Sequence, residues 1–232
     1  APEADKVIRA RAGQLRAPVY SEGVEWTVNN IAENLVFSGS MGSKEFPLPS
    51  LIGAHQYGNA GTAIAAFETF NDGCFNSRAI MTGLVSANWP ARLHRLTGGK
   101  ISNCIPKSWE LWLDGGHNLA AGSILADHAS INWEDRPLHI IVGMMKSKDT
   151  RDFLCSLARV SATACTVAIP GESNSHSAEE LAESARSVGL DAYPWNDVVS
   201  ALRHIRRFDS ESKRVLICGS LYLAGTVLAA EF

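Results

Sequence analysis

The fold is indicated most clearly by the stretch ELWLDGGHN at residues 110–118. Its apolar start predicts a short strand over 110–113, its two glycines predict a turn, and a helix is expected over about 118–129. The same order recurs downstream: we expect strands at 138–142, 163–169 and 214–218, and helices at 149–159, 177–188, 197–207 and 221–230. This alternation with short connections predicts an open α/β sheet with helices on both faces.

The first 87 residues have a different character. A helix is expected over 3–15, short strands at 25–28 and 34–37, and a loop or hairpin at 38–43 between the second strand and Phe46, with helices at 58–70 and 77–87. These elements lack the repeated strand–helix units of a complete parallel sheet. We therefore place a domain boundary near residue 88 and interpret residues 1–87 as the end of a larger domain.

Composition narrows the function classes. The formal net charge is -3 and the basic residues are scattered, so no broad positive face predicts binding to nucleic acid or to an anionic membrane. The five cysteines are dispersed without a CxxC motif, which favours reduced thiols in a cytoplasm. The histidines show no HxxxH or HExxH spacing, so we expect no metal site built by this chain alone.

Asp114 directly follows the predicted strand at 110–113. Open α/β sheets bind ligands beyond the carboxyl ends of their strands, and a carboxylate there can accept both hydroxyls of a ribose. His117 and Asn118 open the next helix, whose first amides favour an anion such as phosphate. The alternative is structural, because Asp and Asn are common helix caps and Gly-Gly is a common turn.

Four further residues lie at loop junctions of the same kind. Asn59 could pair with a purine edge or cap its helix, and Arg92 could stack on a base, pair with phosphate or remain solvated. Lys148 follows the strand at 138–142, where it could hold a carboxylate or phosphate or form a surface pair with Asp149. Ser220 follows the final strand in the same way.

The order of the motifs is more specific than any one of them. GxHQxxNAxxA, WPxRL, LDGxHN, GMxxxKD and CGSLYLAG follow one another along the chain. Together they resemble the folylpolyglutamate synthase/dihydrofolate synthase family, a branch of the Mur ligase superfamily, over essentially all 232 residues. The sequence departs from the family pattern at four small or flanking positions, where it has Gly61 for Ala, Ala91 for Gly, Gly116 for Ala and Leu119 for Pro.

The resemblance implies two domains. Residues 88–232 would form the Rossmann-like C-terminal glutamate-ligase domain, and residues 1–87 the C-terminal part of the central α/β ATP-binding domain. It implies that Asn59 and Arg92 hold the adenine end of ATP and that Asp114 holds the ribose. It also implies catalytic roles for His117, near the phosphates, and for Lys148. We expect Lys148 and Ser220 to face the bound glutamate.

The implied reaction joins L-glutamate to dihydropteroate or to a reduced folate through an acyl phosphate, using ATP and Mg²⁺. No GxxGKGS-like phosphate loop occurs in these 232 residues. The family places this loop and its magnesium ligands before the point where the chain starts, so we expect this chain to be inactive alone and the complete enzyme to be monomeric. The alternatives are another Mur-type amide ligase and a folded, non-catalytic nucleotide-binding fragment.

Overall fold

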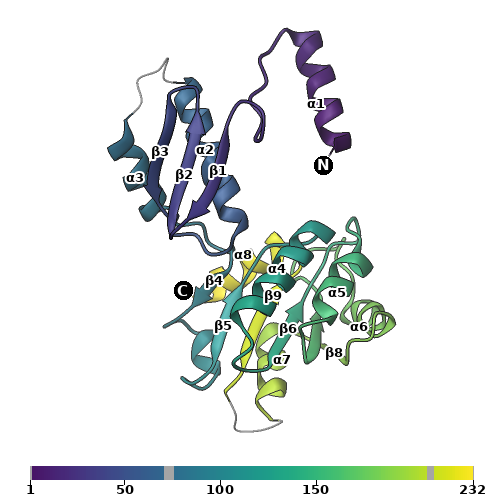
Figure 1. The fold of residues 1–232 in the computed structure, drawn as a ribbon. Coiled ribbons are helices and arrows are strands. Elements are labelled where there is room, and N and C mark those ends of the chain that lie inside the picture. The colour runs from purple at the N-terminus through teal and green to yellow at the C-terminus, as the bar shows by residue number, and fades with distance from the viewer. Residues whose placement is uncertain (1, 71–75, 208–211, 232) are drawn as a thin grey trace. The chain divides into compact units, whose positions relative to one another are not determined.

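The computed structural model describes residues 2–70, 76–207 and 212–231, which form two compact units (Figure 1). Unit 1 comprises Ala1–Ser50 and Ala54–Asn88, and unit 2 comprises Leu51–Gly53 and Trp89–Phe232. The division therefore falls between Asn88 and Trp89, and each unit has its own hydrophobic core. Within the described residues, no helix combines the length and apolar composition needed to cross a bilayer.

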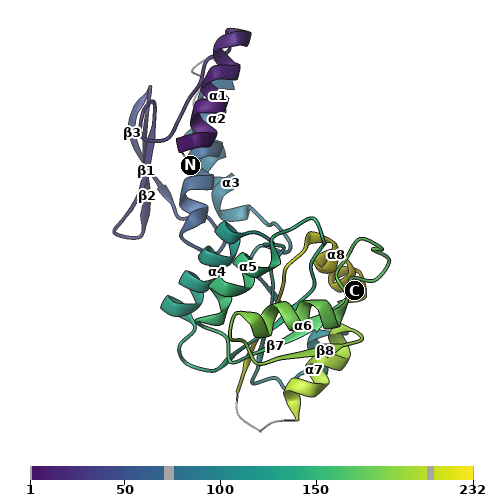
Figure 2. The ribbon, with the colours of Figure 1, turned by 90° about the vertical axis from the view of Figure 1, so that its right-hand side faces the viewer.

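Unit 1 is built on a three-stranded antiparallel sheet in the order β1-β2-β3. The strands are β1 (Thr27–Ile31), β2 (Asn34–Gly39) and β3 (Gly42–Pro47), preceded by helix α1 (Pro2–Leu15). Helices α2 (His55–Phe70) and α3 (Ser77–Ser86) cover one face of the sheet (Figure 2). The predicted hairpin is confirmed, since Gly39 pairs with Gly42 across a two-residue loop.

Two details of unit 1 differ from the sequence predictions. Strand β1 begins at Thr27 rather than at Glu25. Strand β3 extends from Gly42 to Pro47, beyond the predicted hairpin or loop at 38–43. Phe46 is the residue through which the strand reaches the core. The core of unit 1 also explains Gly61, since a Cβ atom there would lie 2.6 Å from both Trp26 and Val28.

Unit 2 is a six-stranded sheet in the order β4-β5-β9-β6-β7-β8, in which only the β4–β5 pairing is antiparallel. Strand β9 lies between β5 and β6, although it comes last in the sequence. The strands are β4 (His94–Leu96), β5 (Glu110–Leu113), β6 (Leu138–Val142), β7 (Thr163–Val167), β8 (Ala192–Trp195) and β9 (Arg214–Cys218). The helices are η1 (Ser102–Cys104), α4 (Leu119–Asn132), α5 (Thr150–Ala158), α6 (Ala178–Ser187), α7 (Val198–Arg206) and α8 (Leu221–Glu231).

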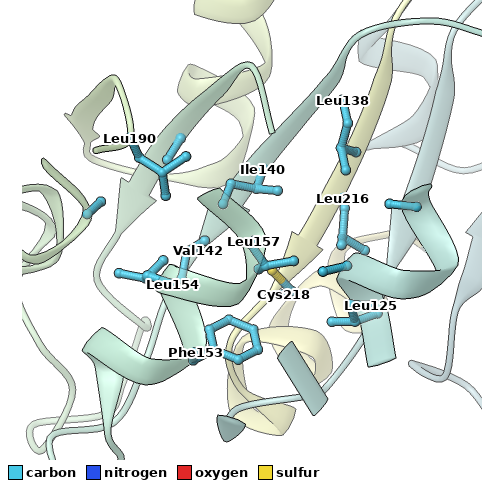
Figure 3. Close-up of a cluster of buried hydrophobic side chains, with 14 of the residues drawn as sticks. Leu125, Leu138, Ile140, Val142, Phe153, Leu154, Leu157, Leu190, Leu216 and Cys218 are labelled. Atoms are coloured by element: carbon cyan, nitrogen blue, oxygen red, sulfur yellow. The ribbon is translucent and has the colours of Figure 1, made fainter. Parts of the chain in front are cut away.

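Helices cover both faces of this sheet, as the alternation predicts. On one face, α4, α5 and α6 bury Leu125, Phe153 and Leu181 against the strands, and Figure 3 shows part of this cluster around Ile140 and Leu216. On the other face, α7 and α8 bury residues such as Leu202 and Val227 in a second cluster. The predicted capping box of α6 is also confirmed, because Ser177 and Glu180 exchange hydrogen bonds at its start.

Candidate functional site

The turn that follows β5 is organised by a buried carboxylate. Asp114 is 8% exposed. Its Oδ2 accepts a hydrogen bond from the Leu93 amide at 2.8 Å, and its Oδ1 accepts one from the Gly116 amide at 2.7 Å. Asp114 therefore ties the Trp89–Leu93 turn to the turn after β5, and sequence reasoning could not find this bond because Leu93 lies 21 residues away.

The Trp89–Leu93 turn needs that support. Ala91 and Leu93 have φ angles of +60° and +42°, in the left-handed region that costs a residue with a Cβ atom about 1–2 kcal/mol. The Gly115 amide donates to the Ala91 carbonyl at 2.9 Å, which holds the turn from a second point. The positive φ at Ala91 gives a physical reason why the resembled family has glycine at this position.

The two glycines of the Asp114 turn lie in confined space. A Cβ atom on Gly116 would lie 2.8 Å from both Asp114 Oδ1 and Ala121 Cβ, which accounts for glycine in place of the family's alanine. A Cβ atom on Gly115 would run into the Leu221 side chain and would lie 3.3 Å from Arg92 Nη1. The half-buried Arg92 guanidinium therefore lies beside the Asp114 turn.

The side chains of His117 and Asn118 have different hydrogen-bonding roles in the Asp114 turn. Asn118 caps α4, because its Oδ1 accepts from the Ala121 amide at 2.9 Å, so the structural alternative is correct for this residue. His117 Nδ1 lies 3.0 Å from the Gly115 carbonyl oxygen. Since a carbonyl can only accept, Nδ1 carries the proton and Nε2 remains to contact a ligand.

The turn after β9 meets the Asp114 turn. The Gly219 amide donates to the Gly116 carbonyl at 3.0 Å. Gly219 has φ +102°, and a Cβ atom there would lie 2.8 Å from the Gly143 carbonyl oxygen, so the position requires glycine. Ser220 is 3% exposed, and its Oγ accepts from the Tyr222 amide at 3.0 Å at the start of α8. The Ser220 hydroxyl can still donate its own proton.

The turn after β6 carries two lysines with different surroundings. Both side chains are exposed, and Lys146 Nζ lies 3.6 Å from Glu180 Oε1. Asp149 caps α5, with its Oδ1 accepting from the Asp152 amide at 3.1 Å, so its carboxylate has a structural role apart from any pairing with Lys148. Because β6 is the immediate neighbour of β9, Lys148 and Ser220 follow adjacent strands.

Asn59 belongs to unit 1 and is not a helix cap. Helix α2 begins at His55, so Asn59 lies in its second turn with an exposed side chain. Asn59 Nδ2 donates to Gln56 Oε1 at 2.9 Å. The capping alternative is therefore wrong for Asn59. Gln56 is part of the GxHQxxNAxxA motif, but sequence reasoning assigned it no function.

The two buried thiols of unit 2 have raised pKa values. Burial raises the pKa of the Cys218 thiol well above its ordinary value, and the charge of Asp114 raises it further. Burial likewise raises the pKa of Cys165 to about 12. Both thiols therefore stay protonated near neutral pH. Among the residues that the structure describes, no group of three His, Cys, Asp or Glu side chains could hold a metal ion.

Unit 2 thus brings Arg92, Asp114, His117, Lys148 and Ser220 to the carboxyl ends of β5, β6 and β9, or to the turn bonded to them. An open, doubly wound sheet with polar side chains in these turns defines the class of α/β domains that bind ligands at that edge. The particular family is shown by a family model described as "Dihydrofolate synthetase, C-terminal domain", which matches residues 99–230. The chain belongs to this family.

Comparisons with individual proteins agree with this assignment. The chain is 26% identical over 235 residues to a dihydrofolate synthase/folylpolyglutamate synthase of Bacillus subtilis, covering 97% of this chain and 52% of that protein. A folylpolyglutamate synthase of Mycobacterium tuberculosis complexed with ADP has a similar fold, with a TM-score of 0.81, 22% identity, and coverage of 99% of this chain and 52% of that one. E. coli FolC in complex with DHPP and ADP gives a TM-score of 0.76, 23% identity, and coverage of 97% and 50%. The chain spans about half the length of the relatives it matches.

Proposed function

We propose that this chain is the C-terminal part of an ATP-dependent ligase that joins L-glutamate to dihydropteroate or to a reduced folate. The observation that carries the proposal is the Asp114 turn with Arg92 beside it, in a chain of the dihydrofolate synthetase C-terminal family. Residues 1–87 would complete the central ATP-binding domain, and residues 88–232 would form the glutamate-ligase domain. The division of the chain at Asn88 supports this boundary.

Asp114 can hold a ribose although both of its oxygens already accept backbone hydrogen bonds. Each carboxylate oxygen has a second lone pair, so the two ribose hydroxyls can still donate to it. The backbone bonds fix the carboxylate before the nucleotide arrives, which lowers the entropy lost on binding. Arg92 and Asn59 would contact the adenine.

The reaction would proceed in two steps. A substrate carboxylate oxygen attacks the γ-phosphorus of ATP and ADP leaves, which gives an acyl phosphate. The amine of L-glutamate then attacks the acyl carbon and loses a proton, and inorganic phosphate leaves as the amide forms. His117 would lie near the phosphates with Nε2 as its ligand-facing nitrogen, and Lys148 and Ser220 would bind the glutamate through charge and a donated hydrogen bond.

We assign the magnesium ligands and the phosphate loop to another part of the complete enzyme, as the family resemblance implies, and we expect this chain alone to be inactive. Among the described residues, no group of three His, Cys, Asp or Glu side chains could hold a metal ion. We also propose a monomer in the cytoplasm, which agrees with free thiols at Cys104, Cys155, Cys165 and Cys218, while Cys74 lies outside the described residues.

Replacement of Asp114 by Asn in the complete enzyme tests the ribose role. Asn keeps the size of the side chain and one acceptor oxygen but lacks the charge, so we expect the KM for ATP to rise about 10-fold or more. Asp127→Asn, which changes an exposed carboxylate on α4, is the matched control and should leave this KM unchanged. An unaltered KM for ATP in a folded Asp114→Asn enzyme would contradict the assignment.

The isolated chain provides a second test. Calorimetry with ATP and Mg²⁺ should detect weak binding at best, because most phosphate contacts would come from elsewhere in the enzyme. Sub-micromolar affinity would show instead that the chain is a self-sufficient nucleotide-binding module. Ligation assays of the complete enzyme with dihydropteroate and with a reduced folate, each as sole acceptor, identify which acceptor it uses.

A further inference from the structure

Three polar side chains at the start of α2 form a hydrogen-bonded series. The His55 and Gln56 side chains meet at 3.0 Å through their Nε2 atoms, and Asn59 Nδ2 donates to Gln56 Oε1 at 2.9 Å. Gln56 is 3% exposed, whereas Asn59 is exposed. A buried amide therefore contacts the one residue of unit 1 that the proposed function assigns to the nucleotide.

The Gln56 amide lies with its oxygen toward Asn59 and its nitrogen toward His55. Its Oε1 accepts from Asn59 Nδ2, and its Nε2 faces His55 Nε2, which accepts in this arrangement. If Gln56 alone were inverted, its NH₂ group would face the NH₂ group of Asn59. Gln56 is therefore held between His55 and Asn59, and it restrains the Asn59 amide.

The orientation of Asn59 matters for the choice of base. With one Nδ2 hydrogen on Gln56, Asn59 retains its Oδ1 and its second Nδ2 hydrogen for a ligand. This acceptor–donor pair matches the N6 amino group and N7 of adenine, whereas guanine offers two acceptors, O6 and N7. If the Asn59 amide could rotate freely, its NH₂ group could donate to guanine O6. The hydrogen bond to Gln56 restricts this rotation.

We propose that Gln56 is a positioning residue that holds the Asn59 amide in place and thereby makes the nucleotide site select adenine over guanine. The proposal rests on the proposed function, in which Asn59 contacts the base. It adds a specificity role for a buried residue that does not touch the nucleotide.

The test compares ATP and GTP as substrates of the complete enzyme carrying Gln56→Met, which keeps the side-chain length and removes both polar atoms. We expect the KM for ATP to rise and the ratio of kcat/KM for ATP over GTP to fall by about 5- to 10-fold, as for one well-placed hydrogen bond. The kcat at saturating ATP should change little. Thr62→Val, which removes a hydrogen bond to Gly58 on the same helix, is the control and should leave the ratio unchanged.

Rescue separates positioning from support of the fold. Gln56→Glu retains an oxygen that accepts from Asn59, so it should restore much of the ATP preference. A folded Gln56→Met enzyme with an unchanged ATP-to-GTP ratio overturns the proposal, even if its stability is lower. If Gln56→Met does not fold, His55→Phe removes the acceptor that orients Gln56, and the same ratio decides. Absence of ATP-dependent ligation in the unmodified enzyme would refute the proposed function instead.

Discussion

The two ends of the unit 2 sheet use buried charge in different ways. At the carboxyl ends, the Asp114 carboxylate accepts hydrogen bonds from backbone amides of two turns. At the amino ends, Glu110 and Arg214, which begin the adjacent strands β5 and β9, pair at 2.7 Å. At the carboxyl ends, backbone amides surround the Asp114 carboxylate, which keeps lone pairs for a ligand. At the amino ends, the charges of Glu110 and Arg214 are compensated by other side chains.

The amino-end cluster is tightly connected. Arg214 also pairs with Asp135 at 2.9 Å and lies over the Trp133 ring at 5.0 Å, and its side chain is only 5% exposed. Glu110 accepts a further hydrogen bond from Trp112 Nε1 at 3.1 Å. Loss of one member of this cluster would leave its partners buried without compensation, whereas the turns at the other end hold the residues assigned to chemistry. We therefore expect variants at the amino end to change stability, and variants at the carboxyl end to change activity as well.

The largest expected effect is on stability at the amino end. Arg214→Met leaves Glu110 mostly buried beside an apolar side chain, and loss of one partner of a buried pair costs about 3–5 kcal/mol. Arg95→Met is the matched control, because Arg95 meets the same carboxylate at 3.4 Å with a side chain that is 52% exposed, and it should cost at most about 1 kcal/mol. Urea unfolding measures both. Equal losses would remove the distinction between buried and exposed partners.

At the carboxyl end, Gly219→Ala should affect both stability and activity. The φ of +102° and the 2.8 Å approach to the Gly143 carbonyl oxygen predict a loss of about 2–4 kcal/mol from backbone strain and crowding. The displaced turn carries Ser220, so the KM for glutamate in the complete enzyme should rise as well. Gly225→Ala is the control. It lies inside α8 with open space around it and should stabilise by up to about 1 kcal/mol.

The amino end should also respond to acid. Burial of Glu110 opposes its ionisation, but the hydrogen bonds from Arg214 and Trp112 and the nearby arginine charges outweigh burial and hold its pKa below the ordinary 4.5. The folded state therefore binds this proton less readily than the unfolded state. The stabilisation is present above pH 4.5 and is lost as the pH falls through the lower folded pKa.

Urea midpoints measured from pH 6 to pH 3 test this expectation. Glu110→Gln cannot ionise, so its stability should fall less steeply with acid than that of the unmodified chain. Asp135 has a pKa lowered by hydrogen bonds from Arg214 and Arg136, and it should keep part of the acid response in the variant. Parallel curves for the two proteins would show that Glu110 gains nothing from its partners.

The sequence predicted the buried strands of unit 2 well because most of their residues are apolar, as in Leu138–Val142, where only His139 is polar. It missed the edge strands β4 and β8, which are only three and four residues long, and β8 contains Pro194. The insertion of β9 between β5 and β6 depends on pairing between residues about 100 positions apart, such as Leu111 with Val215. Local periodicity carries no information on that pairing.

The candidate site was predictable only in part, for the same reason. A carboxylate after a strand and before a Gly-Gly turn marks Asp114 from local sequence alone. Its bond to the Leu93 amide and the contact between the Gly116 and Gly219 turns join distant segments. Gln56 was overlooked because a buried glutamine resembles a surface one in sequence, and only its 3% exposure distinguishes it.

The smallest expected effect tests whether the Asp114 turn tolerates change on its outer side. Leu119 is the first residue of α4 and is 53% exposed, and Asn118 before it has φ -139° and ψ 169°, a conformation that suits a residue before proline. Leu119→Pro should therefore stabilise the chain by about 0.4–1 kcal/mol, because it restricts the unfolded state without removing the Asn118 cap. A thermal unfolding scan measures the gain. Leu221, the first residue of α8, does not provide a matched control, because its side chain packs near Gly115. A loss of stability together with a higher KM for ATP would show that Asp114 depends on this helix start, and the carboxyl end would then be as tightly interlocked as the amino end.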